Sequence, residues 1–346
     1  MTRNRILRAA IAVVLLTSAS PRAQAPGQAP ADGRGAGRGT RPPRVRTLSP
    51  GPDLGYGYDV NPLSLPPEVT FARQIGGMAM NSQGHIFVFH RATAGKPQVL
   101  EFDANQKFVR GFAEDIAVRA HGIRIDTEDN IWLCDQGGNV VIKMNSQREV
   151  VMRIGERGTP GLWDEAAGRR LLFNPTDLAF APNGDIYIAQ GHGSESPSGF
   201  PASVLLLNKD GRFIAQWRGD IEGPGKFAMA HSIVLDARGN LYLADREDKR
   251  IVVYDGKGRF VKAIQMANLV CAFMVARDGS LWMANGQDGQ VEKIDWDGNV
   301  LGWSGIGPGN GPGQFGEASY MVMDAKGDIY VSDTSLGRVQ KLIKKN

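Results

Sequence analysis

A fourteen-residue pattern of apolar and polar positions recurs six times along the chain. Each copy has an apolar run, a polar turn that contains Asn, Asp or Gly, and a second apolar run. Such a pattern predicts two antiparallel β-strands joined by a tight turn. The copies are GGMAMNSQGHIFVF from Gly76, HGIRIDTEDNIWLC from His121, TDLAFAPNGDIYIA from Thr176, HSIVLDARGNLYLA from His231, CAFMVARDGSLWMA from Cys271 and SYMVMDAKGDIYVS from Ser319.

Further apolar segments follow the better copies, such as NVVIKMN and EVVMRIG after the second one. Four strands per repeat, at a spacing of 40 to 55 residues, predict the blades of an all-β, six-bladed β-propeller. The sixth copy ends after three strands, at RVQKLIKKN. We therefore expect a strand from within Val45–Val60 to complete the last blade and close the ring, which would remove the open sheet edges.

The N-terminal residues have a different composition. Residues 1–25 have three arginines before a short apolar run and then an Ala-Gln-Ala step, which is typical of a secretory signal peptide and predicts a secreted or periplasmic protein. Pro26 is a poor cleavage context, so the cleavage site and an uncleaved anchor stay open. Residues 26–52 are rich in Pro, Gly and Arg and predict a disordered linker, which leaves residues 53–346 for the propeller.

Composition and charge change this picture little. The 44 glycines and 19 prolines suit short strands and turns, and the net charge of +4 owes much to the linker. Basic and acidic residues alternate across the propeller, which argues against nucleic-acid binding. After the signal peptide, no segment is long enough to span a membrane. Cys134 and Cys271 could pair in an exported protein, but sequence does not show that they meet.

The repeat also predicts which side chains surround the central channel. The first strand of a blade lines the axis, so His121 and His231, both at the first aligned position, should lie near one mouth. The turn after the second strand returns to that mouth and should bring Arg91, His192 and Arg246 over it. Imidazole and guanidinium groups there predict a metal or anion site. Structural histidines and arginines that merely bridge blades are the alternatives.

These repeats resemble the NHL-repeat propellers and, among them, the peptidyl-α-hydroxyglycine α-amidating lyases. The resemblance rests on IFVFHR ending at Arg91, HGI at His121, FNPTDLAFAPNGDIYIAQGHG in the third repeat and AHSIVLDARGNLYLADREDKRI in the fourth. It implies that His121 and His231 are two of three zinc ligands and that Arg91 and Arg246 are active-site arginines. It also implies a structural calcium at the backbone carbonyls of Met78 and Ile123.

The chain departs from the pattern of that family at two places. The third zinc histidine and the aspartate after it are replaced by Ser319 and Tyr320. The catalytic tyrosine of the family corresponds to His192, which could act as the general base or as a replacement zinc ligand, but not easily as both. Cys271 is another possible soft ligand, although a buried core thiol is the simpler role.

The resemblance predicts a metal-assisted lyase that splits a small α-hydroxy amide or peptide into an amide and glyoxylate, in a monomeric protein. A zinc ion would lower the pKa of the hydroxyl group, and an arginine would bind the carboxylate. A non-catalytic propeller that binds a peptide, glycan or protein is the second hypothesis, favoured by Ser319. A gluconolactonase-like hydrolase is the third, and Gly76 and Gly77 offer it no acidic ligand.

Overall fold

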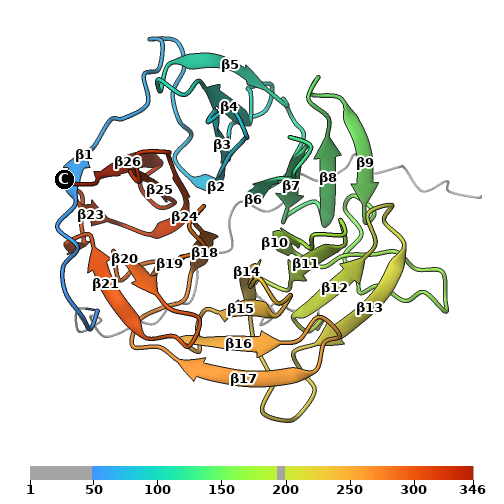
Figure 1. Ribbon diagram of the computed structural model, residues 1–346. Helices are drawn as coiled ribbons and strands as arrows, with labels where there is room; N and C mark the ends of the chain where they lie inside the picture. Colours follow the sequence, from blue (N-terminus) through green and yellow to red (C-terminus); the bar gives the residue numbers. More distant parts are fainter. Residues whose placement is uncertain (1–48, 193–198, 346) are drawn as a thin grey trace, which may run out of the picture. The chain divides into compact units, whose positions relative to one another are not determined.

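The computed structural model describes residues 49–192 and 199–345, and the regular elements within these ranges are β-strands. Six four-stranded sheets surround a central axis, which confirms the predicted all-β, six-bladed propeller (Figure 1). The predicted signal peptide and residues 26–48 of the predicted linker lie outside the described residues.

The blades follow the order of the six repeats. The first three are β2 (Ile75–Met80), β3 (Ile86–His90), β4 (Val99–Phe102) and β5 (Phe108–Phe112); β6 (Ala120–Ile125), β7 (Ile131–Asp135), β8 (Val140–Met144) and β9 (Val150–Ile154); and β10 (Pro175–Phe180), β11 (Ile186–Gln190), β12 (Ser203–Leu207) and β13 (Phe213–Arg218). Within each blade, neighbouring strands are antiparallel.

The next two blades are β14 (Ala230–Leu235), β15 (Leu241–Asp245), β16 (Arg250–Tyr254) and β17 (Phe260–Gln265), and β18 (Ala272–Val275), β19 (Leu281–Ala284), β20 (Val291–Ile294) and β21 (Val300–Ser304). The sixth blade has β24 (Ala318–Met323), β25 (Ile329–Asp333) and β26 (Arg338–Ile343). A short parallel pair before it, β22 (Gly307–Pro308) with β23 (Gln314–Phe315), was not predicted from the sequence.

A strand from the N-terminal side closes the ring. β1 (Gly57–Asp59) pairs antiparallel with β26 and is the fourth strand of the sixth blade, as predicted (Figure 1). The chain already packs before this strand, because the buried Ser49 hydroxyl donates to Gln290 Oε1 at 3.0 Å and accepts from Asn268 Nδ2 at 2.8 Å. The first and last strands of the propeller are therefore held in one sheet.

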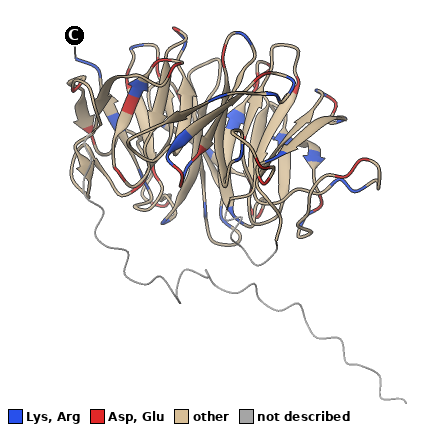
Figure 2. Cartoon of the chain, turned by 90° about the horizontal axis from the view of Figure 1, so that it is seen from below, with Lys and Arg blue, Asp and Glu red and all other residues tan. Residues whose placement is uncertain are grey.

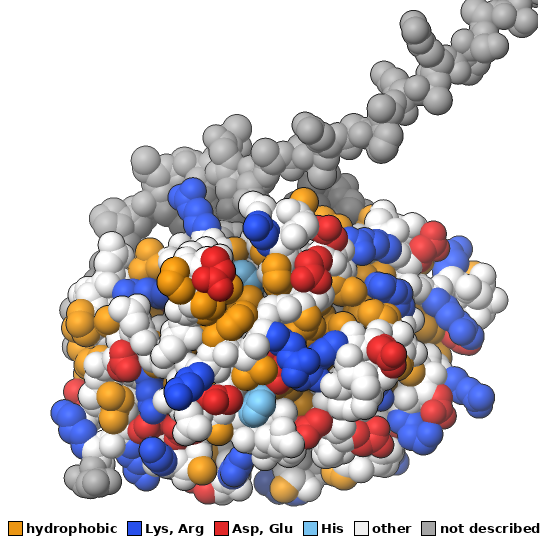
Figure 3. Space-filling model, turned by 90° about the horizontal axis from the view of Figure 1, so that it is seen from above, with side chains coloured by type: hydrophobic (Ala, Val, Ile, Leu, Met, Phe, Trp, Pro, Cys, Tyr) orange, Lys and Arg blue, Asp and Glu red, His pale blue; other side chains and the backbone are white. Residues whose placement is uncertain are grey.

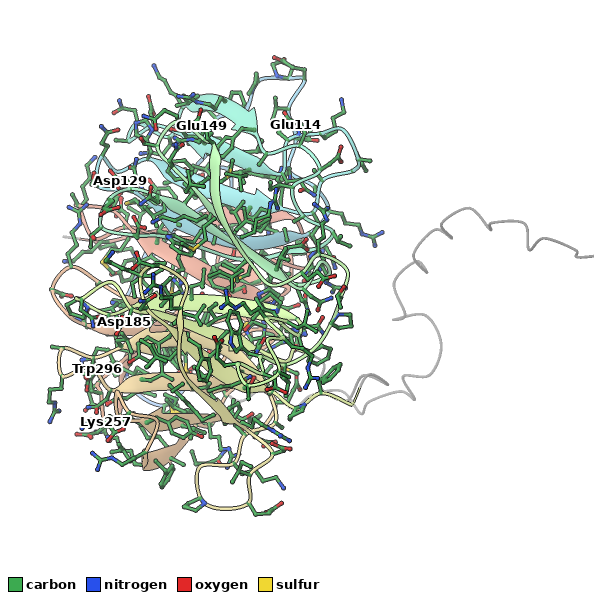
Figure 4. The ribbon with its side chains drawn as sticks, turned by 90° about the vertical axis from the view of Figure 1, so that its right-hand side faces the viewer. Glu114, Asp129, Glu149, Asp185, Lys257 and Trp296 are labelled. Carbon is green, nitrogen blue, oxygen red and sulfur yellow. The ribbon has the colours of Figure 1, made fainter. Side chains whose placement is uncertain are left out.

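Antiparallel strands place two kinds of turn at one face of the ring. Asp129 and Asp185 lie in turns between first and second strands, and Lys257 and Trp296 lie in turns between third and fourth strands. Figure 4 shows these four residues toward the same face, and Glu114, in the connection between two blades, toward the other. The ends of the second strands therefore meet the entries to the first strands at that other face.

The hydrophobic core lies between the blades. Each of six buried apolar clusters is formed mainly by residues of two adjacent blades. In the interface between the fifth and sixth blades, the Tyr56 ring packs edge-on against Trp282 at a centroid distance of 6.2 Å. Packing of sheet against sheet therefore buries most of the apolar side chains.

A polar side chain at the end of the second strand holds the entry to the first strand. The buried carboxylates of Asp135, Asp245 and Asp333 each accept two backbone N–H groups, two and three residues before the first aligned position. Gln190 and His90 accept a backbone N–H of the same segment in their blades. These bonds fix the backbone just ahead of the channel mouth, where the site residues lie.

Charged side chains of both signs are distributed over the propeller. Figure 2 shows Lys and Arg next to Asp and Glu on many strands and turns, and Figure 3 shows the two signs interspersed on one flank. Within residues 49–192 and 199–345, no helix is long and apolar enough to cross a membrane. Cys134 and Cys271 are both buried free thiols, so the open question of a disulfide is answered against pairing.

The N-terminal closure should stabilise the fold measurably. We expect Tyr56→Ala to lower the free energy of unfolding by about 3 kcal/mol, because it removes a buried ring from the interface with Trp282. Tyr56→Phe keeps the ring and loses only the 3.4 Å hydrogen bond to the Gly327 carbonyl, so it should cost less than about 1 kcal/mol. Urea unfolding of the variants measures both values, and equal midpoints would contradict this packing.

Candidate metal centre

Three histidines from three blades meet at one mouth of the channel. His121 lies on β6, His231 on β14, and His192 follows β11. Their ring centroids are 5.0 to 5.2 Å apart, and one ring nitrogen of each lies within 4.8 Å of the others. Among the described residues, this is the group of His, Cys, Asp and Glu side chains whose spacing suits a metal ion.

Breaks in strand register accompany two of these histidines. The pairing of β6 with β7 shifts between Ala120 and Ile123, which leaves His121 in the irregular segment. The pairing of β14 with β15 shifts between Ala230 and Ile233, around His231. A β-bulge turns a side chain away from its regular alternation, and bulges are common beside functional sites. This local geometry explains why histidines can replace aliphatic residues at these positions.

A glycine and an asparagine position His192. Gly191 has a φ of +105°, and a Cβ there would lie 2.3 Å from Ala202 Cα, so a side chain would not fit. The N–H of Gly191 donates to the Asn174 carbonyl at 3.1 Å, and Asn174 Nδ2 donates to the His192 carbonyl at 2.9 Å. The turn after β11 therefore directs His192 toward the other two imidazoles.

Backbone carbonyls determine the tautomers of His121 and His231. His121 Nδ1 lies 2.9 Å from the Thr176 carbonyl, and His231 Nδ1 lies 2.6 Å from the Cys271 carbonyl. A carbonyl only accepts, so both Nδ1 atoms carry the proton, and each Nε2 has a free lone pair. Such second partners are typical of metal-binding histidines. Three imidazoles with an open position match the ligand set of a catalytic zinc ion.

All three imidazoles are neutral at neutral pH. Burial lowers the pKa of His121 to about 3, and the nearby charge of Arg91 acts in the same direction. Burial also lowers the pKa of His192 and of His231 well below the usual value, with further contributions from the neighbouring histidines and Arg246. A metal ion can therefore bind without displacing protons from these rings.

Both predicted arginines lie at this mouth, with different partners. Arg91 donates to Gln74 Oε1 at 2.5 Å and to the Ala120 carbonyl at 3.1 Å, and so it connects two blades beside His121. Arg246 is 5% exposed, and its Nη2 donates to Glu317 Oε1 at 2.7 Å. Within the described part of the chain, Arg246 Nε is buried without a hydrogen-bond partner. A buried, unpaired N–H is costly unless a ligand accepts its hydrogen bond.

Ser319, which stands in place of the third zinc histidine of the family, and the nearby Cys271 have other partners. Ser319 Oγ lies 3.7 Å from Cys271 Sγ, and that thiol lies 4.0 Å from His231 Nδ1, the nitrogen that already donates to a carbonyl. Burial raises the pKa of Cys271 to about 11, which keeps the thiol protonated and favours its role as a core residue. His192 rather than Ser319 completes the group of three ring nitrogens.

Among the described residues, the six inner strands offer no unpaired carboxylate for a calcium site. Met78 and Ile123 are fully buried on the inner strands β2 and β6. Tyr320 brings a phenol ring to the axis, and its hydroxyl donates to the Thr176 carbonyl at 3.0 Å. The carboxylate of Asp177 is already paired with the Arg124 guanidinium. Calcium needs six to eight oxygen ligands, usually with free carboxylates, so these residues do not fit it.

Sequence reasoning missed Glu317, Arg124 and Asp177. Glu317 lies two residues before the first aligned position of the sixth repeat, outside the aligned pattern. Asp177 occupies the second aligned position, which holds Gly77, Gly122 or other uncharged residues in the remaining copies. A single acidic residue against five neutral ones at this aligned position was the signal that could have found it.

Comparison with known proteins agrees with this fold. A family model described as a 6-bladed beta-propeller matches residues 201–301. Peptidyl-glycine alpha-amidating monooxygenase B of Xenopus laevis is 28% identical over 273 residues, which cover 74% of this chain and 30% of that protein. A probable peptidyl-alpha-hydroxyglycine alpha-amidating lyase of Caenorhabditis elegans is 27% identical over 202 residues, with 51% and 54% covered. The chain thus spans well under two thirds of either relative.

Two further similarities are to proteins other than the amidating lyases. NHL repeat-containing protein 3 of Mus musculus is 32% identical over 168 residues, which are 46% of this chain and 45% of that protein. The structure of a gluconolactonase from Xanthomonas campestris superposes with a TM-score of 0.57 at 18% identity, and covers 87% of this chain and 99% of the other, which is a likeness of fold. The chain is a six-bladed β-propeller that is similar in sequence to the peptidyl-α-hydroxyglycine α-amidating lyases and to an NHL repeat-containing protein.

Proposed function

We propose that this protein is an exported, metal-dependent lyase that cleaves the C–N bond of an α-hydroxyglycine-type amide. The observation that carries the proposal is the convergence of His121, His192 and His231, with ring nitrogens within 4.8 Å of one another. The sequence similarity to amidating lyases supports the reaction type. Export rests on the signal peptide predicted for residues 1–25.

Zinc is the metal that suits these donors best. Neutral imidazoles are good zinc ligands, and three of them leave a coordination position for substrate. A zinc ion held there would lower the pKa of a hydroxyl group and stabilise its negative charge. In this assignment His192 is a ligand, so it does not serve as the general base that the tyrosine of the family would provide.

Arg246 is placed to bind the carboxylate of the substrate. Its Nη2 is held by Glu317, and its buried Nε has no hydrogen-bond partner within the described residues. A carboxylate oxygen could accept from that Nε, and the charge would strengthen the hydrogen bond. Glu317 thus orients the guanidinium, while Arg246 itself contacts the substrate beside His231.

The proposed reaction is a simple elimination. The hydroxyl of the substrate loses its proton, the C–O bond becomes a carbonyl, and the electron pair of the C–N bond moves to nitrogen. The nitrogen takes up a proton, and the products are a primary amide and glyoxylate. The chain contributes three neutral imidazoles that hold the hydroxyl side, and Arg246, which fixes the carboxylate side of the same carbon.

Metal analysis of single variants tests the triad. We expect the purified protein, loaded with zinc and then dialysed, to retain about one zinc ion per chain. His121→Ala, His192→Ala and His231→Ala should each lower retention strongly, because each removes one of three ligands. His85→Ala is the matched control, since His85 contacts Glu101 outside the site. Full retention in His192→Ala would contradict its role as a ligand.

The lyase reaction is tested by release of glyoxylate from an N-acyl-α-hydroxyglycine. We expect zinc-dependent release, and a decrease of about 10- to 100-fold in kcat/KM for Arg246→Ala, as expected for the loss of a charged hydrogen bond. Arg238→Ala, at a side chain that is 84% exposed, should retain full activity. Release that is absent, or equal in Arg246→Ala, would refute the lyase and leave the propeller as a binding protein.

The buried imidazoles predict the pH dependence of stability. His121 has a pKa of about 3 and His90 of about 4 in the folded protein, both lowered by burial, whereas an unfolded histidine titrates at about 6.5. Their stabilising effect is therefore present above about pH 6.5 and is lost as the pH falls. Urea unfolding of metal-free protein should show lower stability at about pH 5 than at about pH 7. His121→Gln should reduce this difference, and a flat profile would contradict the neutral state of these rings.

A further inference from the structure

A buried ion pair lies on the channel side of the inner strands, below the three histidines. Arg124 Nε donates to Asp177 Oδ1 at 2.8 Å, and Arg124 Nη2 donates to Asp177 Oδ2 at 2.7 Å. The Asp177 side chain is fully buried, and that of Arg124 is 19% exposed. Burial by itself would lower the pKa of Arg124, but Asp177 outweighs this effect and raises it, so the guanidinium is charged.

This pair, from the second and third blades, is connected to the inner strands of three other blades. Ser232 Oγ donates to Asp177 Oδ2 at 2.6 Å and accepts the backbone N–H of Phe273 at 3.1 Å. Arg124 Nη2 approaches the Phe273 carbonyl at 3.4 Å, and its guanidinium carbon lies 5.3 Å from the centre of the Tyr320 ring. Groups from the second to the sixth blade therefore meet around this ion pair.

The repeat shows which layer of the channel this guanidinium occupies. Phe273 is at the third aligned position of the fifth repeat, and Met78 and Ile123 hold the same position in the first and second repeats. The Phe273 carbonyl faces Arg124, so the guanidinium lies at the level at which third-position residues surround the axis. We propose that the Arg124 side chain, paired with Asp177, is the axial cation of this propeller and takes the place of a structural calcium ion.

The chemistry of the surrounding groups agrees with an organic cation. A guanidinium matches a carboxylate with two parallel hydrogen bonds and can lie against an aromatic face, and Asp177 and Tyr320 provide these two partners. Both oxygens of Asp177 are occupied by Arg124 and by Ser232, so neither is left for a metal ion. The disagreement with a calcium site thus has a structural cause, because the chain supplies its own positive charge.

The axial cation also divides the channel. Arg124 lines a cavity of about 710 Å³ at the opposite mouth, together with methionines of the first, fifth and sixth blades, among them Met78, Met274 and Met321. On its other side, Tyr320 donates to the Thr176 carbonyl, which is also the partner of His121. The pair therefore lies between the cavity and the three histidines, and supports the inner strands that carry them.

Thermal unfolding with and without calcium tests this proposal. The experiment uses zinc-loaded protein, so that calcium is the only variable. We expect millimolar calcium to leave the Tm of the wild type unchanged. Arg124→Met should lower the Tm, because it leaves the buried Asp177 carboxylate without a counter-charge, and calcium should restore part of the loss. In Arg124→Met with Asp177→Asn, which removes both charges, the Tm should not respond to calcium.

Two further measurements keep the test decisive. If Arg124→Met does not fold, Arg124→Lys retains a cation without the paired hydrogen bonds, and its Tm should be lower than that of the wild type and insensitive to calcium. A wild-type Tm that rises with calcium would overturn the proposal, and so would an Arg124→Met variant as stable as the wild type or one that calcium does not stabilise. Because the readout is Tm, a failure here is distinguishable from a failure of the lyase proposal.

Discussion

The pairing of β1 with β26 is the constraint on which the site depends. It joins residues near the start of the propeller to its last strand, and so fixes six blades in a closed ring. Direct packing sets the distances between the second, third and fourth blades, and closure of the ring holds that arrangement in place. Packing and closure together bring the histidine rings to centroid distances of 5.0 to 5.2 Å, although 110 residues separate His121 from His231 in sequence.

The core and the site use different parts of each blade. Apolar side chains are buried between adjacent sheets, while the inner strands present backbone carbonyls and polar side chains to the axis. The Thr176 carbonyl illustrates this division, because it accepts from both His121 and Tyr320. One backbone group thus links the three histidines to the ion pair below them, so the metal centre and the axial cation share a rigid support.

Much of the architecture could be predicted from the sequence because the repeat encodes it. The alternating strands, the turns and the incomplete sixth copy indicated six blades and an N-terminal closing strand, and the first aligned position indicated where His121 and His231 meet. The role of His192 could not be decided, because it depends on the turn at Gly191 and on the hydrogen bond from Asn174, and the apolar pattern does not show where a side chain in a turn points. The partnership of Arg246 with Glu317 and of Arg124 with Asp177 joins side chains of different blades, and no local pattern shows such contacts.

The proposed function depends on the identity of the metal ligands. X-ray absorption spectroscopy of the zinc-loaded protein measures them most directly. We predict three imidazole nitrogens at about 2.0–2.1 Å from zinc, with the remaining position taken by an oxygen, as in catalytic zinc sites. A sulfur neighbour at about 2.3 Å, which would place Cys271 on the metal, or a shell with fewer than three imidazoles, would contradict the assignment of His121, His192 and His231.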